Sequence, residues 1–204
     1  MKTSLSPFQR HVEAWRGCTR CTLHHGRRNV VLARGRLPCD VLLIGEAPGK
    51  SEDALGQPFV GPAGHLLDEI VAEALEEQNA LRAEIGGGPL RVGMTNLVAC
   101  VPKGEDGEKL SEPDADEIKR CRPRLVELVR MSKPRFIVLV GSLPRKHITG
   151  QAMFDPVDWL ADGEFIRFIG IDHPAFILRA NFAQRGLLIQ KAVVTIRSSL
   201  AEPF

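Results

Sequence analysis

The acids around a glycine-proline turn are the first residues whose types and spacing could do chemistry. The stretch 42–67 opens as a buried strand and breaks at Gly-Glu-Ala-Pro-Gly, so Glu46 directly follows the strand. Glu52 comes less than two helical turns later, so one loop can aim both carboxylates at one cavity. A carboxylate in a partly enclosed site positions or activates water, or stabilises a developing cation. The loop therefore predicts carboxylate-assisted chemistry at the end of a strand.

Two residues on neighbouring loops suit a planar ligand. Phe59 lies between Pro58 and Val60 in a glycine-bounded loop, where its flat face could stack on a base. Burial in the core is the commoner fate of a phenylalanine. Asn96 ends a predicted strand and offers the donor and the acceptor that read the amide-like edge of a pyrimidine. Asparagine at a strand end is also a frequent turn former. Either residue alone is therefore a weak signal, and only Phe59 and Asn96 together indicate a site for a planar base.

The segment after the last predicted strand adds a histidine and an apolar group. His173 could donate a hydrogen bond to an oxyanion on a leaving base, although a lone histidine is more often structural. Ile177 and Leu178 lie beside Arg179 on a predicted loop. Apolar side chains next to a basic one suit a wedge that enters a base stack, with core packing as the alternative.

The cysteines indicate a metal or cluster site rather than disulfides. Cys18 and Cys21 form a C-x2-C pair, and Cys100 and Cys121 follow much later. Two close and two distant thiolates can make a four-cysteine site for zinc or for an iron–sulfur cluster. A zinc ribbon normally has two C-x2-C knuckles and only one is present, so the pattern favours a cluster. Burial of Cys100 and Cys121 as plain thiols is the alternative, and Cys39 is predicted to lie in the core.

The elements that must position these residues alternate between strands and helices. Short apolar runs predict strands at 40–45, 91–100, 135–141 and 165–171. Helical periodicity follows from about residue 64, over 114–131 and over 181–200. We therefore expect an α/β fold, a three-layer α/β/α sandwich with a central, mostly parallel four-stranded sheet. Ligands bind at the carboxyl ends of such strands, so Glu46, Asn96 and His173 should share one rim.

Length and composition set the class of protein. The chain has 204 residues of which 44% are hydrophobic, enough for one domain over 1–204 with an N-terminal cluster-binding segment. No apolar run reaches the roughly 18 residues of a membrane span, and the N-terminus lacks the apolar stretch of a secretory signal. We expect a cytoplasmic monomer that has no membrane partner.

Charge is segregated along the chain although the net charge is only +2. Lys and Arg gather in 1–40 and 119–146, whereas 105–117 is strongly acidic. A basic surface without a basic isoelectric point suits a polyanion partner such as DNA. The plainer interpretation is a set of solvated faces.

Taken together, these residues resemble the iron–sulfur (family 4) uracil-DNA glycosylases of the uracil-DNA glycosylase superfamily. The resemblance covers nearly the whole chain, from Cys18 to the final helix. Its most specific part is GEAPGKSEDALGQPFVGPAGHLL at 45–67, supported by Thr-Asn at 95–96, the four cysteines and His-Pro-Ala at 173–175.

The resemblance implies a role for each matched position. The four cysteines, Cys18, Cys21, Cys100 and Cys121, would hold a [4Fe–4S] cluster. Glu46 and the backbone at Ala47 would lie at the scissile bond, with Glu52 as a further acid and His173 supporting the leaving O2.

The same resemblance assigns the contacts with the base. Phe59 would stack on the flipped base, and Asn96 would hydrogen-bond its edge. Ile177 or Leu178 would fill the vacated place in the stack.

The activity that this implies is that of a monofunctional DNA glycosylase in base excision repair. The base leaves the stack, the N-glycosidic bond stretches, and negative charge develops on O2 of the pyrimidine. The acids stabilise the sugar cation or orient water, His173 and backbone N–H groups stabilise the anion, and water attacks C1′ to leave an abasic site.

One departure from the family keeps two other functions open. Where relatives usually have a shorter Arg-Pro-Pro-rich loop, residues 101–120 are acidic. The same chemistry on a modified pyrimidine, such as 5-hydroxymethyluracil or a glucosylated hydroxymethylcytosine in anti-phage defence, is one alternative. A non-catalytic iron–sulfur DNA-binding protein is another, and zinc in place of the cluster is a third possibility for the cysteines.

Overall fold

The sheet at the centre of the molecule has five strands in the order β1-β3-β2-β4-β5. The computed structural model describes residues 5–103, 109–149 and 166–201. The strands are β1 (Arg34–Gly35), β2 (Val41–Gly45), β3 (Val92–Asn96), β4 (Phe136–Val140) and β5 (Arg167–Ile171). The strands β3, β2, β4 and β5 are parallel, as expected, whereas β1 pairs antiparallel with β3. The predicted α/β fold is confirmed, and the sheet has one more strand than the four predicted.

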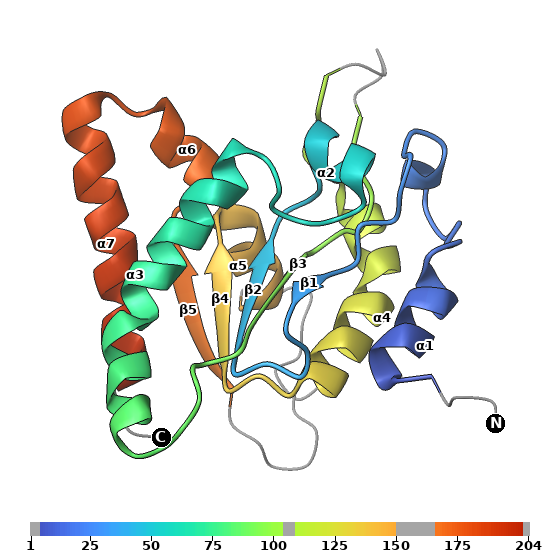
Figure 1. Cartoon of the computed structure of the whole chain (residues 1–204). Coiled ribbons are helices and arrows are strands. Elements are labelled where there is room, and N and C mark those ends of the chain that lie inside the picture. Colours follow the sequence, from blue (N-terminus) through green and yellow to red (C-terminus); the bar gives the residue numbers. More distant parts are fainter. Residues whose placement is uncertain (1–4, 104–108, 150–165, 202–204) are drawn as a thin grey trace.

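Helices cover both faces of this sheet (Figure 1). On one face pack α3 (Pro62–Glu84), α6 (Pro174–Arg179) and α7 (Phe182–Ala201). On the other lie α4 (Ala115–Ser132) and α5 (Ser142–Ile148). Three short elements complete the described chain: α1 (Pro7–Trp15), the 3-10 turn η1 (Thr22–His24) and α2 (Lys50–Leu55).

The alternating side chains of β2 explain why the sheet is buried on both sides. Val41 and Leu43 belong to the core under α3 and α7, and Leu42 and Ile44 belong to the core under α4 and α5. All four are at most 1% exposed. Burial of each such side chain stabilises the fold by about 1.5–3 kcal/mol, so the apolar run favours a strand that is covered on both faces. The strand ends at Gly45.

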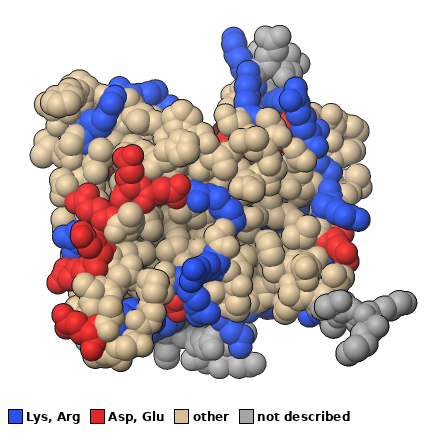
Figure 2. Space-filling model, in the orientation of Figure 1, with Lys and Arg blue, Asp and Glu red and all other residues tan. Residues whose placement is uncertain are grey.

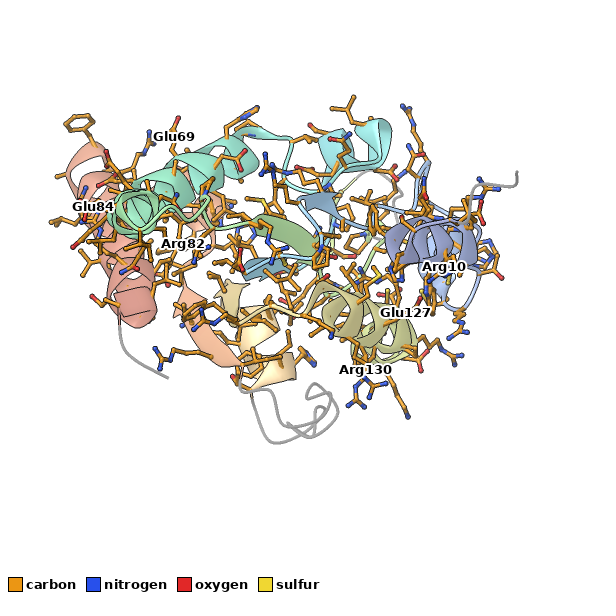
Figure 3. All side chains as sticks on the ribbon, turned by 60° about the horizontal axis from the view of Figure 1, so that its bottom comes forward. Arg10, Glu69, Arg82, Glu84, Glu127 and Arg130 are labelled. Atoms are coloured by element: carbon orange, nitrogen blue, oxygen red, sulfur yellow. The ribbon has the colours of Figure 1, made fainter. Side chains whose placement is uncertain are left out.

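The N-terminal helix α1 docks on α4 through a shared carboxylate. Trp15 Nε1 donates to Glu127 Oε2 at 2.8 Å, and His11 Nδ1 lies 3.1 Å from Glu127 Oε1. Figure 3 shows Glu127 on the part of α4 that adjoins α1. Burial lowers the pKa of His11, against the raising effect of Glu127. This packing brings the chain around Cys18 and Cys21 against α4 and the end of β3.

Several elements differ from their predicted form. The predicted strand 91–100 ends at Asn96, and α4, for which Pro123 favoured an interruption or a kink, is one helix that contains Pro123. The segment 174–179, predicted as a loop, forms α6. Phe165, at the start of the predicted fourth strand, and 104–108 of the acidic loop lie outside the described residues. Within the described ranges, every helix falls short of the length and apolar character that a membrane crossing needs.

Candidate active site

A cavity of about 630 Å³ opens at the carboxyl ends of the parallel strands. Its walls come from the segments that follow β2, β3, β4 and β5, and from α2, α3 and α6. Six of the residues singled out from the sequence line it: Glu46, Ala47, Glu52, Phe59, Asn96 and His173. The structure thus brings these predicted residues together, while Ile177 and Leu178 are absent from the lining.

The floor of the cavity depends on Gly45 having no side chain. A Cβ at this position would lie 2.5 Å from Asn96 Oδ1 and 2.5 Å from Phe59 Cζ. Asn96 is 2% exposed, and its side-chain amide therefore lies beside the Phe59 ring on the bare backbone of the strand end. The Phe59 ring offers a flat apolar face, and the neighbouring Asn96 amide offers a donor and an acceptor. Together they suit a planar ring that carries both donor and acceptor groups.

Phe59 stands in a turn that the surrounding polar groups hold in place. Its φ of 56° is in the left-handed region, which a bulky residue adopts only when its surroundings impose it. Arg34 donates from Nε to the Pro58 carbonyl at 2.7 Å and from Nη2 to the Phe59 carbonyl at 3.1 Å. Arg34 is itself paired with Asp68 at 2.8 Å. The ring is 7% exposed and belongs to the core, as the alternative interpretation predicted, and it also lines the cavity, so stacking on a base stays a prediction.

Glu52 contacts the same turn from the amide side. Its Oε1 accepts from Val60 N at 3.1 Å and Gly61 N at 2.9 Å, and its Oε2 accepts from Gly49 N at 3.1 Å. Both carboxylate oxygens therefore already accept hydrogen bonds from backbone N–H groups. This favours a role for Glu52 in positioning the loop over a role in contact with the reacting atoms. Its neighbour Asp53 accepts from the Arg28 and Asn29 amides and ties the N-terminal segment to α2.

His173 presents one defined ring nitrogen to the cavity. It is the N-cap of α6, and its Nδ1 accepts from Ala175 N at 3.1 Å. In a neutral imidazole the proton then resides on Nε2, which becomes a donor. Burial lowers the pKa of His173, Arg179 lowers it further, and Glu52 opposes them. The ring is thus kept as a neutral donor.

Glu46 carries the carboxylate that is available for chemistry. It follows β2 directly, is partly buried and lines the cavity. Burial raises the pKa of Glu46, and the charge of Glu112 raises it further. A carboxylate with a raised pKa is a stronger base than one in water, which suits the activation of a water molecule.

The structure corrects the prediction of Ile177 as a wedge. Ile177 is 0% exposed and belongs to the core under α3 and α7, because the expected loop is a helix and turns this residue inward. Leu178 is partly buried and packs against the same core. Phe176, an apolar residue of the same segment to which the resemblance assigned no role, is 52% exposed and lines the cavity. Helical phase, had a helix been predicted, would have separated these neighbours.

The four predicted ligand cysteines line one small cavity between α1, the end of β3 and α4. It is lined by Cys18, Cys21, Cys100 and Cys121 and by Arg20, Arg27, Arg120 and Arg124. Burial raises the pKa of Cys100 to about 11, against the lowering effect of Arg27, whose Nη1 lies 3.4 Å from its Sγ. Cys39 lies elsewhere, buried in the core as predicted.

Four thiols with arginines around them are a donor set for a zinc ion or for an iron–sulfur cluster. Zn–S bonds of about 2.3 Å would hold tetrahedral sulfurs about 3.8 Å apart. In the described part of the chain, no three His, Cys, Asp or Glu side chains lie together in a way that could hold one ion. A four-iron cluster has one iron for each thiolate and holds its four sulfurs further apart. Buried Arg124, whose Nε has no partner, adds a cation facing the thiols, so the residues present fit the cluster.

Charge on the surface is divided around the cavity (Figure 2). Acidic side chains gather over α3, whose exposed residues include Glu69, Glu73 and Glu76. Figure 2 also shows basic side chains along the upper edge, and Arg145 and Arg179 line the cavity at the carboxyl ends of the strands. A polyanion would therefore be attracted to the rim that holds the cavity and repelled from the α3 side.

Comparison with known families decides what this arrangement belongs to. Residues 33–197 match the Uracil DNA glycosylase superfamily. The chain belongs to the uracil DNA glycosylase superfamily. The matched span includes the whole sheet and every residue that lines the cavity at the carboxyl ends of the strands, whereas Cys18 and Cys21 precede it.

Individual members of the superfamily agree with this assignment. A type-4 uracil-DNA glycosylase of Thermotoga maritima is 31% identical over 169 residues, 79% of this chain and 78% of that protein. One from Pyrobaculum aerophilum is 36% identical over 139 residues, 68% of this chain and 63% of that protein. One from Archaeoglobus fulgidus is 29% identical over 174 residues, 79% of this chain and 78% of that protein. The match with the Pyrobaculum protein thus spans less than two thirds of that relative.

Proposed function

We propose that this protein is a monofunctional DNA glycosylase that hydrolyses the N-glycosidic bond of a flipped-out uracil in DNA and leaves an abasic site. The observation that carries the proposal is the convergence of Phe59, Asn96, Glu46 and His173 in one cavity. The names of the type-4 relatives support uracil as the base. The product makes the enzyme one of base excision repair.

Recognition would start with extrusion of the base, because its glycosidic carbon is out of reach inside a duplex. The Phe59 ring stacks on the base, and the Asn96 amide donates to O4 and accepts from N3–H of uracil. Cytosine presents the opposite pattern at these two atoms, so a fixed Asn96 amide discriminates between them. The accessible apolar side chains of α6 that could fill the vacated place are Phe176 and Leu178.

Bond cleavage would separate charge between two sides of the cavity. As the bond stretches, the neutral His173 ring donates from Nε2 to O2 of the leaving base and stabilises its negative charge. The Glu46 carboxylate stabilises the positive charge on the sugar and takes a proton from the water that attacks C1′. The Ala47 backbone lies beside this reacting centre, and Glu52 holds the loop that carries Phe59.

The cofactor part of the proposal is a [4Fe–4S] cluster on Cys18, Cys21, Cys100 and Cys121. When bound, it supplies structural support that joins the N-terminal segment to α4. We expect about four irons and four sulfides per chain. Iron and sulfide analysis, with a broad absorbance band near about 400 nm, would separate this from zinc, which gives neither.

A second candidate changes only the base. Pro102, Leu110 and Ser111, from the segment 101–120 that departs from the family, line the cavity. This wall is where a substituent on the pyrimidine would be accepted or refused, so a modified pyrimidine is the alternative substrate.

The test is an excision panel with duplexes that contain uracil, 5-hydroxymethyluracil or glucosylated hydroxymethylcytosine. We expect release of uracil, reduced by about 10²–10⁴-fold in Glu46→Gln while DNA affinity is retained, because the neutral amide neither accepts the proton nor stabilises the sugar cation. Glu69→Gln on the acidic side of α3 is the matched control. Activity on a modified base alone would favour the second candidate. Binding of DNA with no release from any duplex would indicate a non-catalytic iron–sulfur DNA-binding protein.

Assembly and domain organisation complete the proposal. We propose that the chain acts as a monomer and as one domain. Light scattering at the protein concentrations of the excision assay would detect a dimer, and limited proteolysis would detect an independent N-terminal segment.

A further inference from the structure

One buried charge has no use in the chemistry proposed so far. Arg124 on α4 is 1% exposed and is among the largest fully buried side chains. A guanidinium stays protonated in proteins, unlike a buried lysine, and cannot escape burial by losing its proton. Arg124 therefore brings a full positive charge into the interior.

The protein groups around Arg124 supply oxygens but no opposite charge. Its Nη1 donates to Thr95 Oγ1 at 2.9 Å, and its Nη2 donates to the carbonyls of Asn96 at 2.5 Å and Leu97 at 3.0 Å. Its Nε has no partner, and within the described ranges no carboxylate forms an ion pair with it. The acid one turn along the helix, Glu127, is occupied by His11 and Trp15.

Such an arrangement is costly unless an anion lies nearby. An unpaired buried charge carries a large desolvation penalty, and neutral hydrogen bonds offset only part of it. Arg124 lines the cavity of the four cysteines. Four thiolates around a cluster leave net negative charge, which would provide the missing counter-charge at this place.

The Nη2 nitrogen of the same guanidinium donates to the backbone that leads to the base cavity. Asn96 is the last residue of β3 and Leu97 follows it, and the Asn96 side chain lies on the cavity floor. By donating to both carbonyls with one nitrogen, Arg124 fixes the peptide that carries the pyrimidine-reading amide. Arg124 therefore lines the cysteine cavity and holds the backbone of a residue that lines the base cavity.

We propose that Arg124 is a positioning residue that serves as the buried counter-charge of the cysteine-bound cluster and holds Asn96 in register for the base. Loss of the cluster then weakens base recognition through Arg124, although no cysteine reaches the cavity. This inference rests on the proposed cluster and glycosylase activity, and its test must separate their failure from its own.

The experiment compares Arg124→Met, which removes the charge, with Arg124→Lys, which keeps it but loses the planar fork. We expect Arg124→Met to release iron to a chelator about 10–100-fold faster, as when an outer-shell partner of a metal ligand is removed. The reduction potential of its cluster should also move to a more negative value. Arg124→Lys should restore retention and potential, yet bind free uracil more weakly than wild type, because Asn96 loses its paired contact. Arg130→Met, on an exposed part of α4 that Figure 3 shows at its outer side, is the matched control.

The outcomes separate the two levels of the proposal. A wild-type chain without iron overturns the cluster and this inference together, whatever it does to uracil. Suppose that wild type holds iron and excises uracil. This inference alone is then overturned if Arg124→Met keeps iron and binds uracil within twofold of wild type and shows an unchanged reduction potential. Should Arg124→Met fail to fold, the same inference is overturned by an Arg124→Lys protein that matches wild type in uracil affinity.

Discussion

The base cavity and the cysteine cavity are built in opposite ways, although both use the end of β3. The base cavity is shaped by backbone: Gly45 leaves the floor bare, and Glu52 and Arg34 hold the Phe59 turn through its amides and carbonyls. The cysteine cavity is shaped by long side chains from distant segments, with arginines around thiols. The first is therefore sensitive to added volume, and the second to lost charge.

The largest expected effect breaks the first region and leaves the second intact. Gly45→Ala would place a Cβ 2.5 Å from both Asn96 Oδ1 and Phe59 Cζ, so both must move. We expect uracil excision to fall by roughly a hundredfold or more, and stability by about 1–3 kcal/mol. Iron content should stay at the wild-type value. Single-turnover excision, thermal unfolding and iron analysis measure the three.

The control for this substitution is Gly88→Ala, where a Cβ would have nothing within 4 Å. It should excise uracil as wild type does. Equal loss in the two variants would mean that Gly45 acts through the chain in general and not through the cavity floor.

An intermediate effect should appear as pH dependence of the base cavity alone. The pKa of His173 is lowered from 6.5 and that of Glu46 is raised from 4.5. His173 therefore stays neutral as pH falls to 6.5, and the loss of activity comes below that value, as Glu46 gains a proton and the imidazole becomes charged. We expect the excision rate to fall by about tenfold per pH unit once one of these groups titrates.

The measurement is the single-turnover rate between pH 8 and 4.5, alongside absorbance of the cluster as a check on the second region. Glu112→Gln should move the acid limb to lower pH, since Glu112 helps raise the pKa of Glu46. A rate that already falls between pH 8 and 7 would contradict neutral His173 as the donor.

The smallest expected effect concerns Phe176, an exposed residue in the wall of the base cavity. Because Phe176 is exposed and Ile177 is buried, Phe176→Ala should lower excision from a duplex more than from a single strand, by about tenfold at most. Phe182→Ala, a second exposed phenylalanine of the C-terminal helices, is the control. Equal losses on duplex and single strand would argue against a wedge at this position.

The residues predicted from sequence were those whose role depends on their place along a strand. Glu46, Asn96 and His173 follow strand ends, and parallel topology alone brings them to one rim. The apolar runs of β2 and β4 predicted those strands to within a residue of their bounds. The presence of a fifth strand was missed, because β1 has two residues and forms only by pairing with β3.

Roles that depend on a partner far along the chain escaped prediction. The carboxylate of Glu52 accepts hydrogen bonds from the Val60 and Gly61 amides. The local sequence pattern did not predict that the loop folds back onto Glu52. In the sequence, Arg124 is one more basic residue of a charged helix. Its hydrogen bond to the Asn96 carbonyl is known only once the end of β3 is placed beside α4. The inward turn of Ile177 required α6 to be a helix, whereas this segment was predicted as a loop.

The left-handed backbone of Phe59 has a consequence for laboratory evolution of this protein. Glycine would adopt the φ of 56° without strain, whereas phenylalanine adopts it at a cost in backbone free energy. The residue that best suits the backbone therefore differs from the aromatic residue that we propose stacks on the base. Libraries selected only for heat resistance should therefore drift toward glycine or asparagine at this position. Libraries selected for excision should keep an aromatic ring, and the divergence of the two pools would map where folding and catalysis compete.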